Sequence, residues 1–276
     1  MLYPPTIKLL LVDLDGTLLN GRAELTAESR EAVRQCAADG IAVVPATARP
    51  PRSTRRFYEM LRLDTPSIHY NGALVYDFPT ETALLHQPIP GQLAEELSER
   101  ALEFDGTAVV SLEVCDRWYL NRMSDHLATQ TEREGFRPDY VGDLGGCFDE
   151  PVTKVLMSFP GADVREAEKV FRGAFSGRLE FTKTDESVLQ VMNAGVSKGS
   201  AAEFIMDRLG IAREESAAIG DAPNDVPMLE AVGLSIAMAN GYPEARAAAD
   251  YVTLSNDENG AAAAVRRFIL RASREK

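Results

Sequence analysis

Two aspartates, one residue apart, end the first aliphatic run of the chain. The stretch Ile7 to Asn20 reads IKLLLVDLDGTLLN, with Asp13 and Asp15 directly after the run. Two carboxylates that point the same way repel each other unless a cation lies between them. A buried strand that stops at two such charges therefore predicts a cation site at its carboxyl end.

Other polar residues follow later predicted strands. In open parallel sheets, ligands bind beyond the carboxyl ends of the strands, so these residues should meet at one edge. Several carboxylates with only oxygen ligands suit Mg²⁺, whereas a hydroxyl and an ammonium at helix starts suit a phosphate. The residues are Thr47 and Arg49 after the second strand, Lys198 at the start of a helix, and Gly220, Asp221, Asn224 and Asp225 after Ala217–Ile219.

Such a set of residues could carry out phosphoryl transfer. With Mg²⁺ and Lys198 screening the charges, a carboxylate can attack phosphorus and form an aspartyl-phosphate. Asp15 would then give a proton to the leaving oxygen and later take one from water, and two carboxylates in different environments can divide these roles. Since the sequence has no ATP-binding P-loop, HExxH or GxSxG motif, it favours hydrolysis of a small phosphate monoester.

Composition excludes several other classes. The formal net charge of -13 opposes binding to nucleic acid or to an anionic membrane, and no apolar stretch is long enough to span a bilayer. The three cysteines form no CxxC pair, so neither a disulfide framework nor a structural zinc site is expected. We expect a cytoplasmic chain whose partner is a small phosphate ester, as a monomer or a weak homo-oligomer.

Hydrophobic patterns predict an α/β fold, a doubly wound parallel Rossmann-like sheet assembled from two separated segments. The run at residues 7–12, a helix over Thr26–Gly40 and the strand-like IAVVP form one βαβ unit, and strands alternate with helices again after Val196. Between them, paired strand runs and helices indicate an antiparallel α+β module. The expected domains are a core of residues 1–84 and 190–276 and an inserted cap of residues 85–189.

Four motifs, DLDGT (13–17), ATAR (46–49), VSKG (196–199) and IGDAPND (219–225), resemble the ordered motifs of the haloacid dehalogenase superfamily. YNGALVY (70–76) and AMAN (237–240) are similar to those of its Cof-type sugar-phosphate phosphatases, and the cap position resembles subtype IIB. Ala48 departs from the glycine common in the family. The resemblance implies a nucleophile, Asp13; a general acid/base, Asp15; phosphate binders, Thr47, Lys198 and Asn224; Mg²⁺ ligands, Asp13, Asp15 through its carbonyl, Asp221 and Asp225; and Asn71 beside the substrate.

Several alternatives stay open. Arg49 could belong to the phosphate site, whereas Arg52, Arg55 and Arg56 are expected on a solvated helix face rather than at a second anion site. Asn71 and Gly72 either form a turn with positive φ or present the Asn71 side chain to substrate. A phosphomutase on the same scaffold and a non-catalytic phosphometabolite sensor are the rival functions. The three histidines, His69, His86 and His126, lack metal-ligand spacing and are assigned no chemistry.

Overall fold

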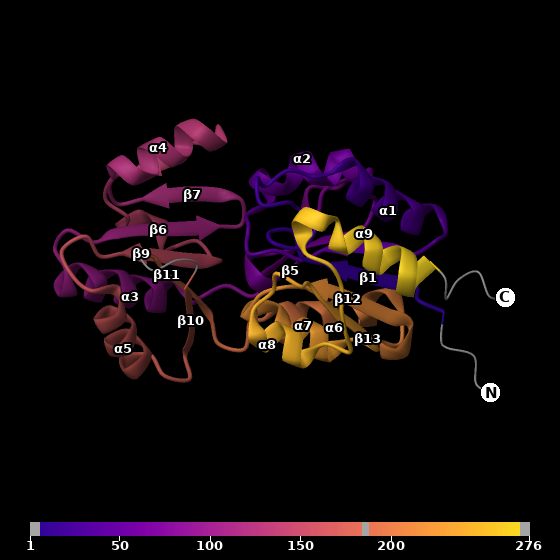
Figure 1. Ribbon diagram of the computed structural model, residues 1–276. Helices are drawn as coiled ribbons and strands as arrows, with labels where there is room; N and C mark the ends of the chain where they lie inside the picture. The colour runs from indigo at the N-terminus through magenta and orange to yellow at the C-terminus, as the bar shows by residue number, and fades with distance from the viewer. Residues whose placement is uncertain (1–5, 184–187, 271–276) are drawn as a thin grey trace. The chain divides into compact units, whose positions relative to one another are not determined.

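The computed structural model of the chain describes residues 6–183 and 188–270. These residues form two compact units (Figure 1). The first contains the described residues of Met1–Arg49, Thr54–Leu84 and Ser197–Lys276, and the second contains those of Pro50–Ser53 and Leu85–Val196. The first unit is therefore built from distant parts of the sequence, and most of the second is one insertion between them.

A five-stranded parallel sheet forms the centre of the first unit. Its strands are β1 (Leu9–Val12), β2 (Ala42–Pro45), β12 (Ser216–Gly220), β13 (Leu234–Ala237) and β14 (Tyr251–Val252), and its helices are α1 (Ala27–Ala38), α6 (Lys198–Leu209), α7 (Val226–Ala231), α8 (Pro243–Ala248) and α9 (Gly260–Ala264). The strand order is β14-β13-β12-β1-β2. Helices α1 and α9 lie on one face of the sheet, and α6, α7 and α8 lie on the other (Figure 1).

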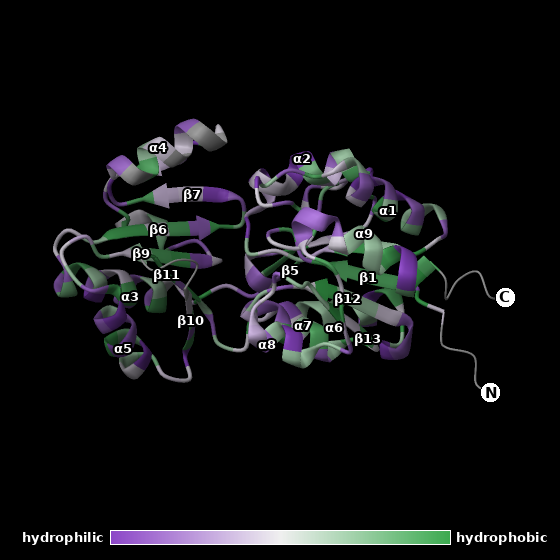
Figure 2. Cartoon of the chain, in the orientation of Figure 1, coloured by the Kyte–Doolittle hydropathy of each residue, from purple (hydrophilic) through white to green (hydrophobic). Residues whose placement is uncertain are grey.

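The sequence of β1 explains its central position. All four of its aliphatic residues are buried, as expected for a strand covered on both faces, and Figure 2 shows the strand in the hydrophobic colour. Leu10 and Val12 belong to a hydrophobic cluster with Val33 and Cys36 of α1 and with residues of α9. Since β1 pairs with both β2 and β12, the residues after β1 are flanked by the loops that follow these two strands.

Side-chain caps fix where two helices begin. The Thr26 hydroxyl accepts a hydrogen bond from the Ser29 amide at the start of α1, and the Ser197 hydroxyl accepts one from the Ser200 amide at the start of α6. Each cap satisfies an N–H that the helix itself leaves unpaired. The Ser197 cap consequently holds Lys198 in the first turn of α6.

A small antiparallel sheet, β3-β4-β5, lies between β2 and the insertion along the chain. Its strands are β3 (Ser67–His69), β4 (Leu74–Asp77) and β5 (Thr82–His86), and α2 (Pro51–Leu61) precedes it. Ala46 forms a parallel bridge with Ile68, which attaches β3 beside the end of β2. A 3-10 turn, Tyr70–Gly72, joins β3 to β4 and has positive φ at all three residues.

The second unit is an α+β module. Its strands are β6 (Val109–Val114), β7 (Arg117–Leu120), β8 (Tyr140–Val141), β9 (Lys154–Ser158), β10 (Leu179–Lys183) and β11 (Val188–Asn193), and its helices are α3 (Gly91–Phe104), α4 (Asp125–Glu134) and α5 (Val164–Ala174). The sheet has the order β10-β11-β9-β6-β7-β8. Val110 and Met157 of the sheet share a hydrophobic cluster with Leu97 of α3 and Phe171 of α5. Because side chains alternate along a strand, Glu113 and Lys154 lie on the opposite face.

These features confirm the fold class expected from the sequence, a doubly wound parallel sheet with an inserted α+β module. The expected boundary between residues 189 and 190 falls inside β11, which pairs with β9 and β10 over most of its length and belongs whole to the second unit. None of the described helices is long and apolar enough to cross a membrane.

One expected surface residue is instead enclosed. Arg52 forms a two-pronged ion pair with the Glu113 carboxylate, at 2.7 and 2.8 Å, and its side chain is 17% exposed. The prediction that Arg52 lies on a solvated helix face is therefore wrong. Its guanidinium donates hydrogen bonds to the Glu113 carboxylate, which is 61 positions away along the chain. Arg55 keeps a more exposed side chain and pairs with Glu81.

Candidate active site

Three predicted carboxylates gather at the carboxyl ends of neighbouring strands. Asp13 follows β1 and Asp221 follows β12, and these strands are paired in parallel up to Val12 and Ile219. One carboxylate oxygen from each of Asp13, Asp221 and Asp225 lies within 4.8 Å of the others, and all three residues are buried. The order of the strands thus brings together residues that are more than 200 positions apart in the sequence.

Lys198 reaches into this cluster from the first turn of α6. Its Nζ lies 2.6 Å from Asp13 Oδ1 and 2.6 Å from Asp225 Oδ1, and the lysine is 1% exposed. The second oxygen of Asp225, Oδ2, accepts hydrogen bonds from the backbone amides of Asp221 and Ala222. Asp225 is consequently held by both oxygens and orients Lys198 toward Asp13.

The charges of the cluster do not balance without a further cation. Burial raises the pKa of Asp13 well above its usual range, and Asp225 and Asp221 raise it further against the lowering effect of Lys198. Burial also raises the pKa of Asp221, to about 6. Burial alone would lower the pKa of Lys198, but the attraction of Asp13 and Asp225 outweighs it and raises the pKa. Three carboxylates facing one ammonium leave an excess of negative charge, which a divalent cation held by the carboxylate oxygens of Asp13 and Asp221 would balance.

Asp15 and Arg49 form a pair beside this cluster. Arg49 Nε lies 2.6 Å from Asp15 Oδ2, and Arg49 Nη2 lies 2.5 Å from Asp15 Oδ1. The Asp15 side chain is half exposed, and its carboxylate is not among the three that cluster. The predicted acid/base residue, Asp15, therefore has a different environment from the predicted nucleophile, Asp13. Arg49 contacts Asp15 directly.

Thr47, Asn71 and Asn224 connect three of the motifs. Thr47 is buried, its hydroxyl accepts a hydrogen bond from the Arg49 amide, and its carbonyl accepts one from the Asn71 amide. The Asn224 side-chain amide donates to Asn71 Oδ1 at 2.8 Å. Because a Cβ at Gly72 would lie 2.1 Å from the Ser197 carbonyl oxygen, only glycine fits where this turn meets the start of α6.

Asn71 has φ of 56° and Gly72 has φ of 107°, which confirms the turn with positive φ that the sequence left as one alternative. The presentation of the Asn71 side chain to substrate stays a prediction.

Thr17 is a site residue to which sequence reasoning gave no role. Its hydroxyl donates a hydrogen bond to Asp221 Oδ1 at 2.7 Å, and the residue is buried. At Gly16, φ is +81° and a Cβ would lie 2.4 Å from Asp221 Oδ2, so the turn after β1 packs directly against this carboxylate. The signal was present in the sequence, since the DLDGT motif ends in Gly16 and Thr17.

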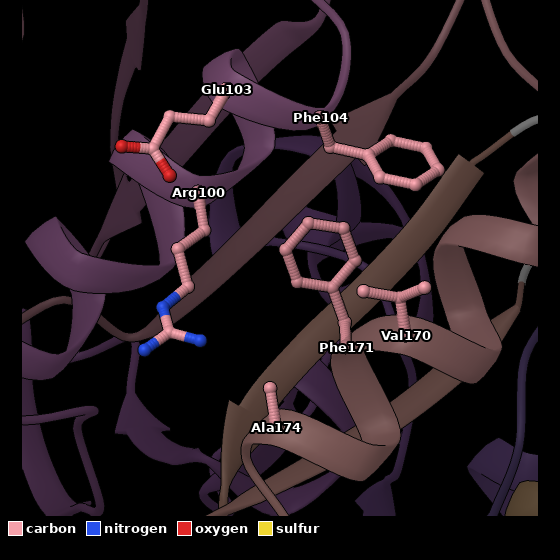
Figure 3. Close-up of a pocket in the computed structure, with 6 residues that line it drawn as sticks. All are labelled: Arg100, Glu103, Phe104, Val170, Phe171 and Ala174. Carbon is pink, nitrogen blue, oxygen red and sulfur yellow. The ribbon is translucent and has the colours of Figure 1, made fainter.

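A pocket in the second unit contains none of the predicted site residues. It has a volume of about 300 Å³ and lies between α3 and α5. Figure 3 shows Phe104 and Phe171 in its wall with Arg100 and Glu103 at one side. Apart from Arg100 and Glu103 its lining is apolar, and these two charged side chains offer no cluster of carboxylates for a metal. Of the histidines to which the sequence assigned no chemistry, His126 has a side chain that lies outside the described residues.

The Rossmann-like core and its acidic site define a class that comparison identifies. The sequence matches the model of the haloacid dehalogenase-like hydrolase family over residues 10–265, so the chain belongs to this family. The chain resembles in fold a solved subclass IIB sugar phosphatase of the superfamily, with a TM-score of 0.81, 21% identity, and coverage of 95% of this chain and 98% of the other.

Particular relatives narrow the class further. The chain is 27% identical over 263 residues to the 5-amino-6-(5-phospho-D-ribitylamino)uracil phosphatase YitU of Bacillus subtilis, covering 94% of this chain and 97% of the relative. It is 32% identical over 283 residues to the phosphatase YwpJ of the same organism, covering 93% and 98%. The chain is accordingly a phosphatase of the haloacid dehalogenase-like family.

Proposed function

We propose that this phosphatase hydrolyses small phosphate monoesters, such as sugar phosphates, with Mg²⁺ and through an aspartyl-phosphate on Asp13. The buried contact of Lys198 with Asp13 and Asp225, next to Asp221, carries the proposal. A buried carboxylate beside an ammonium is suited to attack an anionic phosphate, because the ammonium offsets the repulsion between the two anions. The names of the relatives give a ribitylamino-uracil phosphate and sugar phosphates as substrates, and these are small phosphate monoesters of the kind proposed here.

Mg²⁺ would be held by Asp13, the Asp15 carbonyl and Asp221, with Asp225 beside them. When bound, the ion would supply positive charge that neutralises the phosphate oxygens. Asp225 already accepts hydrogen bonds on both oxygens, from Lys198 and from two backbone amides, so it is suited to orient the site rather than to give the ion a free oxygen.

The proposed reaction has two steps, formation of the aspartyl-phosphate and its hydrolysis. In the first, an Asp13 oxygen forms a bond to phosphorus, the ester P–O bond breaks, and Asp15 gives its proton to the leaving oxygen. In the second, Asp15 takes a proton from water, the water oxygen bonds to phosphorus, and the Asp13–phosphorus bond breaks to release phosphate. Thr47, Lys198 and Asn224 would hold the phosphate oxygens, with Arg49, Asn71 and Gly72 near the substrate.

The test is release of inorganic phosphate from a panel of sugar, pentitol and aryl phosphates, with Mg²⁺ and with EDTA. Wild type is compared with Asp13→Asn, and with Asp207→Asn as a matched control at an exposed position of α6. We expect metal-dependent release in wild type and in the control, and none above background in Asp13→Asn. Turnover of Asp13→Asn at the wild-type rate would refute the nucleophile, and equal rates with and without EDTA would refute the metal.

The same panel separates the rival functions. A phosphomutase passes the group to another sugar hydroxyl, so phosphate release without a bisphosphate activator argues against it. A folded wild-type protein that binds phosphate esters and releases phosphate from none would favour the sensor.

A further inference from the structure

The backbone of Arg49 is held at every polar atom. Its amide donates to the Thr47 hydroxyl at 3.1 Å, and its carbonyl oxygen accepts from the Tyr70 amide at 3.4 Å. The same carbonyl oxygen lies 3.2 Å from Nδ1 of His69, in β3. The guanidinium lies 5.7 Å from the centroid of the Phe57 ring. The side chain therefore starts from a fixed point when it reaches Asp15.

His69 is a buried, neutral residue with a defined tautomer. It is fully buried, and burial lowers its pKa to about 3. A carbonyl oxygen can only accept, so Nδ1 must carry the hydrogen that is donated to Arg49. Nε2 is then an acceptor, and it lies 2.7 Å from the Ser67 hydroxyl, which can donate to it. The rings of His69, Tyr76 and Phe78 pack edge to face against one another, which holds the imidazole in place.

The ion pair between Arg49 and Asp15, whose arginine backbone is held by His69, is not explained by its contribution to stability. The two side chains are 25% and 50% exposed, and an exposed ion pair contributes only about 0–1 kcal/mol. A guanidinium that grips both oxygens of a carboxylate does, however, fix the plane and direction of that carboxylate. The buried histidine and the two-pronged pair are thus better accounted for by orientation than by folding energy.

We infer that Arg49 is a positioning residue for the carboxylate of Asp15, and that His69 fixes the backbone from which Arg49 reaches it. This inference rests on the proposed role of Asp15 in proton transfer. Ser67, His69, Arg49 and Asp15 then form one hydrogen-bonded series from the small sheet to the reacting group.

Leaving groups of different acidity test this inference. An alkyl phosphate needs a proton on its departing oxygen, whereas p-nitrophenolate leaves readily without one. If Arg49 positions the acid, Arg49→Ala lowers kcat for an alkyl phosphate by about a hundredfold, the order of effect of misplacing a catalytic group. The same variant lowers kcat for p-nitrophenyl phosphate much less. Arg56→Ala, which removes a guanidinium that lies 4.4 Å from the centroid of the same Phe57 ring but belongs to helix α2, leaves the ratio of the two rates unchanged.

A double-mutant cycle with Asp15→Asn completes the test. Adding Arg49→Ala to Asp15→Asn should lower kcat for the alkyl phosphate little further, because the two residues act as a unit. Equal losses on both esters, or fully additive losses in the cycle, would overturn the inference and make Arg49 a residue that only binds substrate. Failure of the proposed function itself is recognised separately, since Asp13→Asn would then retain turnover.

The His69 step has its own variants. His69→Leu removes the donor to the Arg49 carbonyl and should lower the alkyl-to-aryl rate ratio about tenfold, in the direction of Arg49→Ala. His69→Asn keeps a donor amide and should restore part of the ratio. Thermal unfolding of each variant is measured alongside. A ratio unchanged in His69→Leu would remove His69 from the inference, whether or not the variant is less stable.

Discussion

Two lysines, one in each unit, are almost equally buried and yet differ in electrostatics. Lys198 is 1% exposed and Lys154 is 4% exposed. Burial is the largest influence on both, and it lowers the pKa of a lysine because it penalises the charged form. The pKa of Lys154 is lowered to about 8, whereas that of Lys198 is raised. Burial alone therefore does not decide the charge state of a lysine in this chain.

The partners of the two ammonium groups explain the difference. Lys198 Nζ contacts two carboxylate oxygens at 2.6 Å each. Lys154 Nζ donates to the neutral Gln190 amide at 3.1 Å, and the nearby Glu113 carboxylate is also gripped by Arg52. Attraction to Glu113 is thus opposed by repulsion from Arg52. A carboxylate stabilises a buried ammonium less when the same carboxylate also forms an ion pair with a second cation.

The largest effect is expected when the core lysine is removed. Lys198→Met leaves Asp13 and Asp225 buried without their cation, and removal of one partner of a buried ion pair typically costs about 3–5 kcal/mol. Loss of the charge at the phosphate should also lower turnover by about a thousandfold. Phosphate release and urea unfolding measure the two losses, with Lys169→Met on the exposed side of α5 as the control. Turnover near the wild-type level would show that Lys198 does not act on substrate.

Removal of the second lysine should change how stability depends on pH. The folded-state pKa of Lys154 is about 8 against an ordinary value of 10.5, so between these pH values the unfolded chain binds more protons than the folded chain. Stability contributed by this residue therefore rises with pH across that window, by up to about 3 kcal/mol at about 1.4 kcal/mol per unit. Below pH 8 the full penalty of the buried charge is present.

Urea unfolding of wild type and Lys154→Met at pH 7.5, 9 and 10 tests this slope. The free energy of unfolding of wild type should gain on that of the variant as the pH rises. Other lysines, tyrosines and cysteines titrate in both proteins and cancel in the difference. A difference that stays constant over the range would show that Lys154 keeps an ordinary pKa.

The contrast between the two lysines also separates what a sequence can and cannot predict. Asp13, Lys198, Asp221 and Asp225 could be expected to meet, because each follows a strand or opens a helix in an alternating α/β pattern, and parallel strands end at one edge. A local signal, the Thr26 cap, marked the start of α1 in the same way.

The surroundings of Lys154 could not be predicted by that route. Its surroundings include Glu113 in β6, Gln190 in β11 and Arg52 in α2. Strand register and the ion pair between Arg52 and Glu113 bring these residues together, rather than any short motif. Arg49 shows the same limit within the core, since the sequence left open whether this residue belongs to the phosphate site and did not indicate its pair with Asp15. Long-range pairing of charged side chains is set by tertiary packing, which periodicity does not report.

The smallest and sharpest test converts one environment into the other. Gln190→Glu places a carboxylate where the amide oxygen lies 3.1 Å from Lys154 Nζ, which makes this lysine resemble Lys198. An opposite charge at this distance favours the ammonium, so the pKa of Lys154 should rise and the pH-dependent gain in stability between pH 8 and 10 should shrink by about 1 kcal/mol. The matched Gln190→Leu variant, which removes the hydrogen bond without adding charge, should preserve or increase that gain. If the pH-dependent gain in stability of Gln190→Glu is as large as that of wild type, a carboxylate partner does not restore the pKa of Lys154. The difference between the two lysines would then have a cause other than the charge of their hydrogen-bond partners.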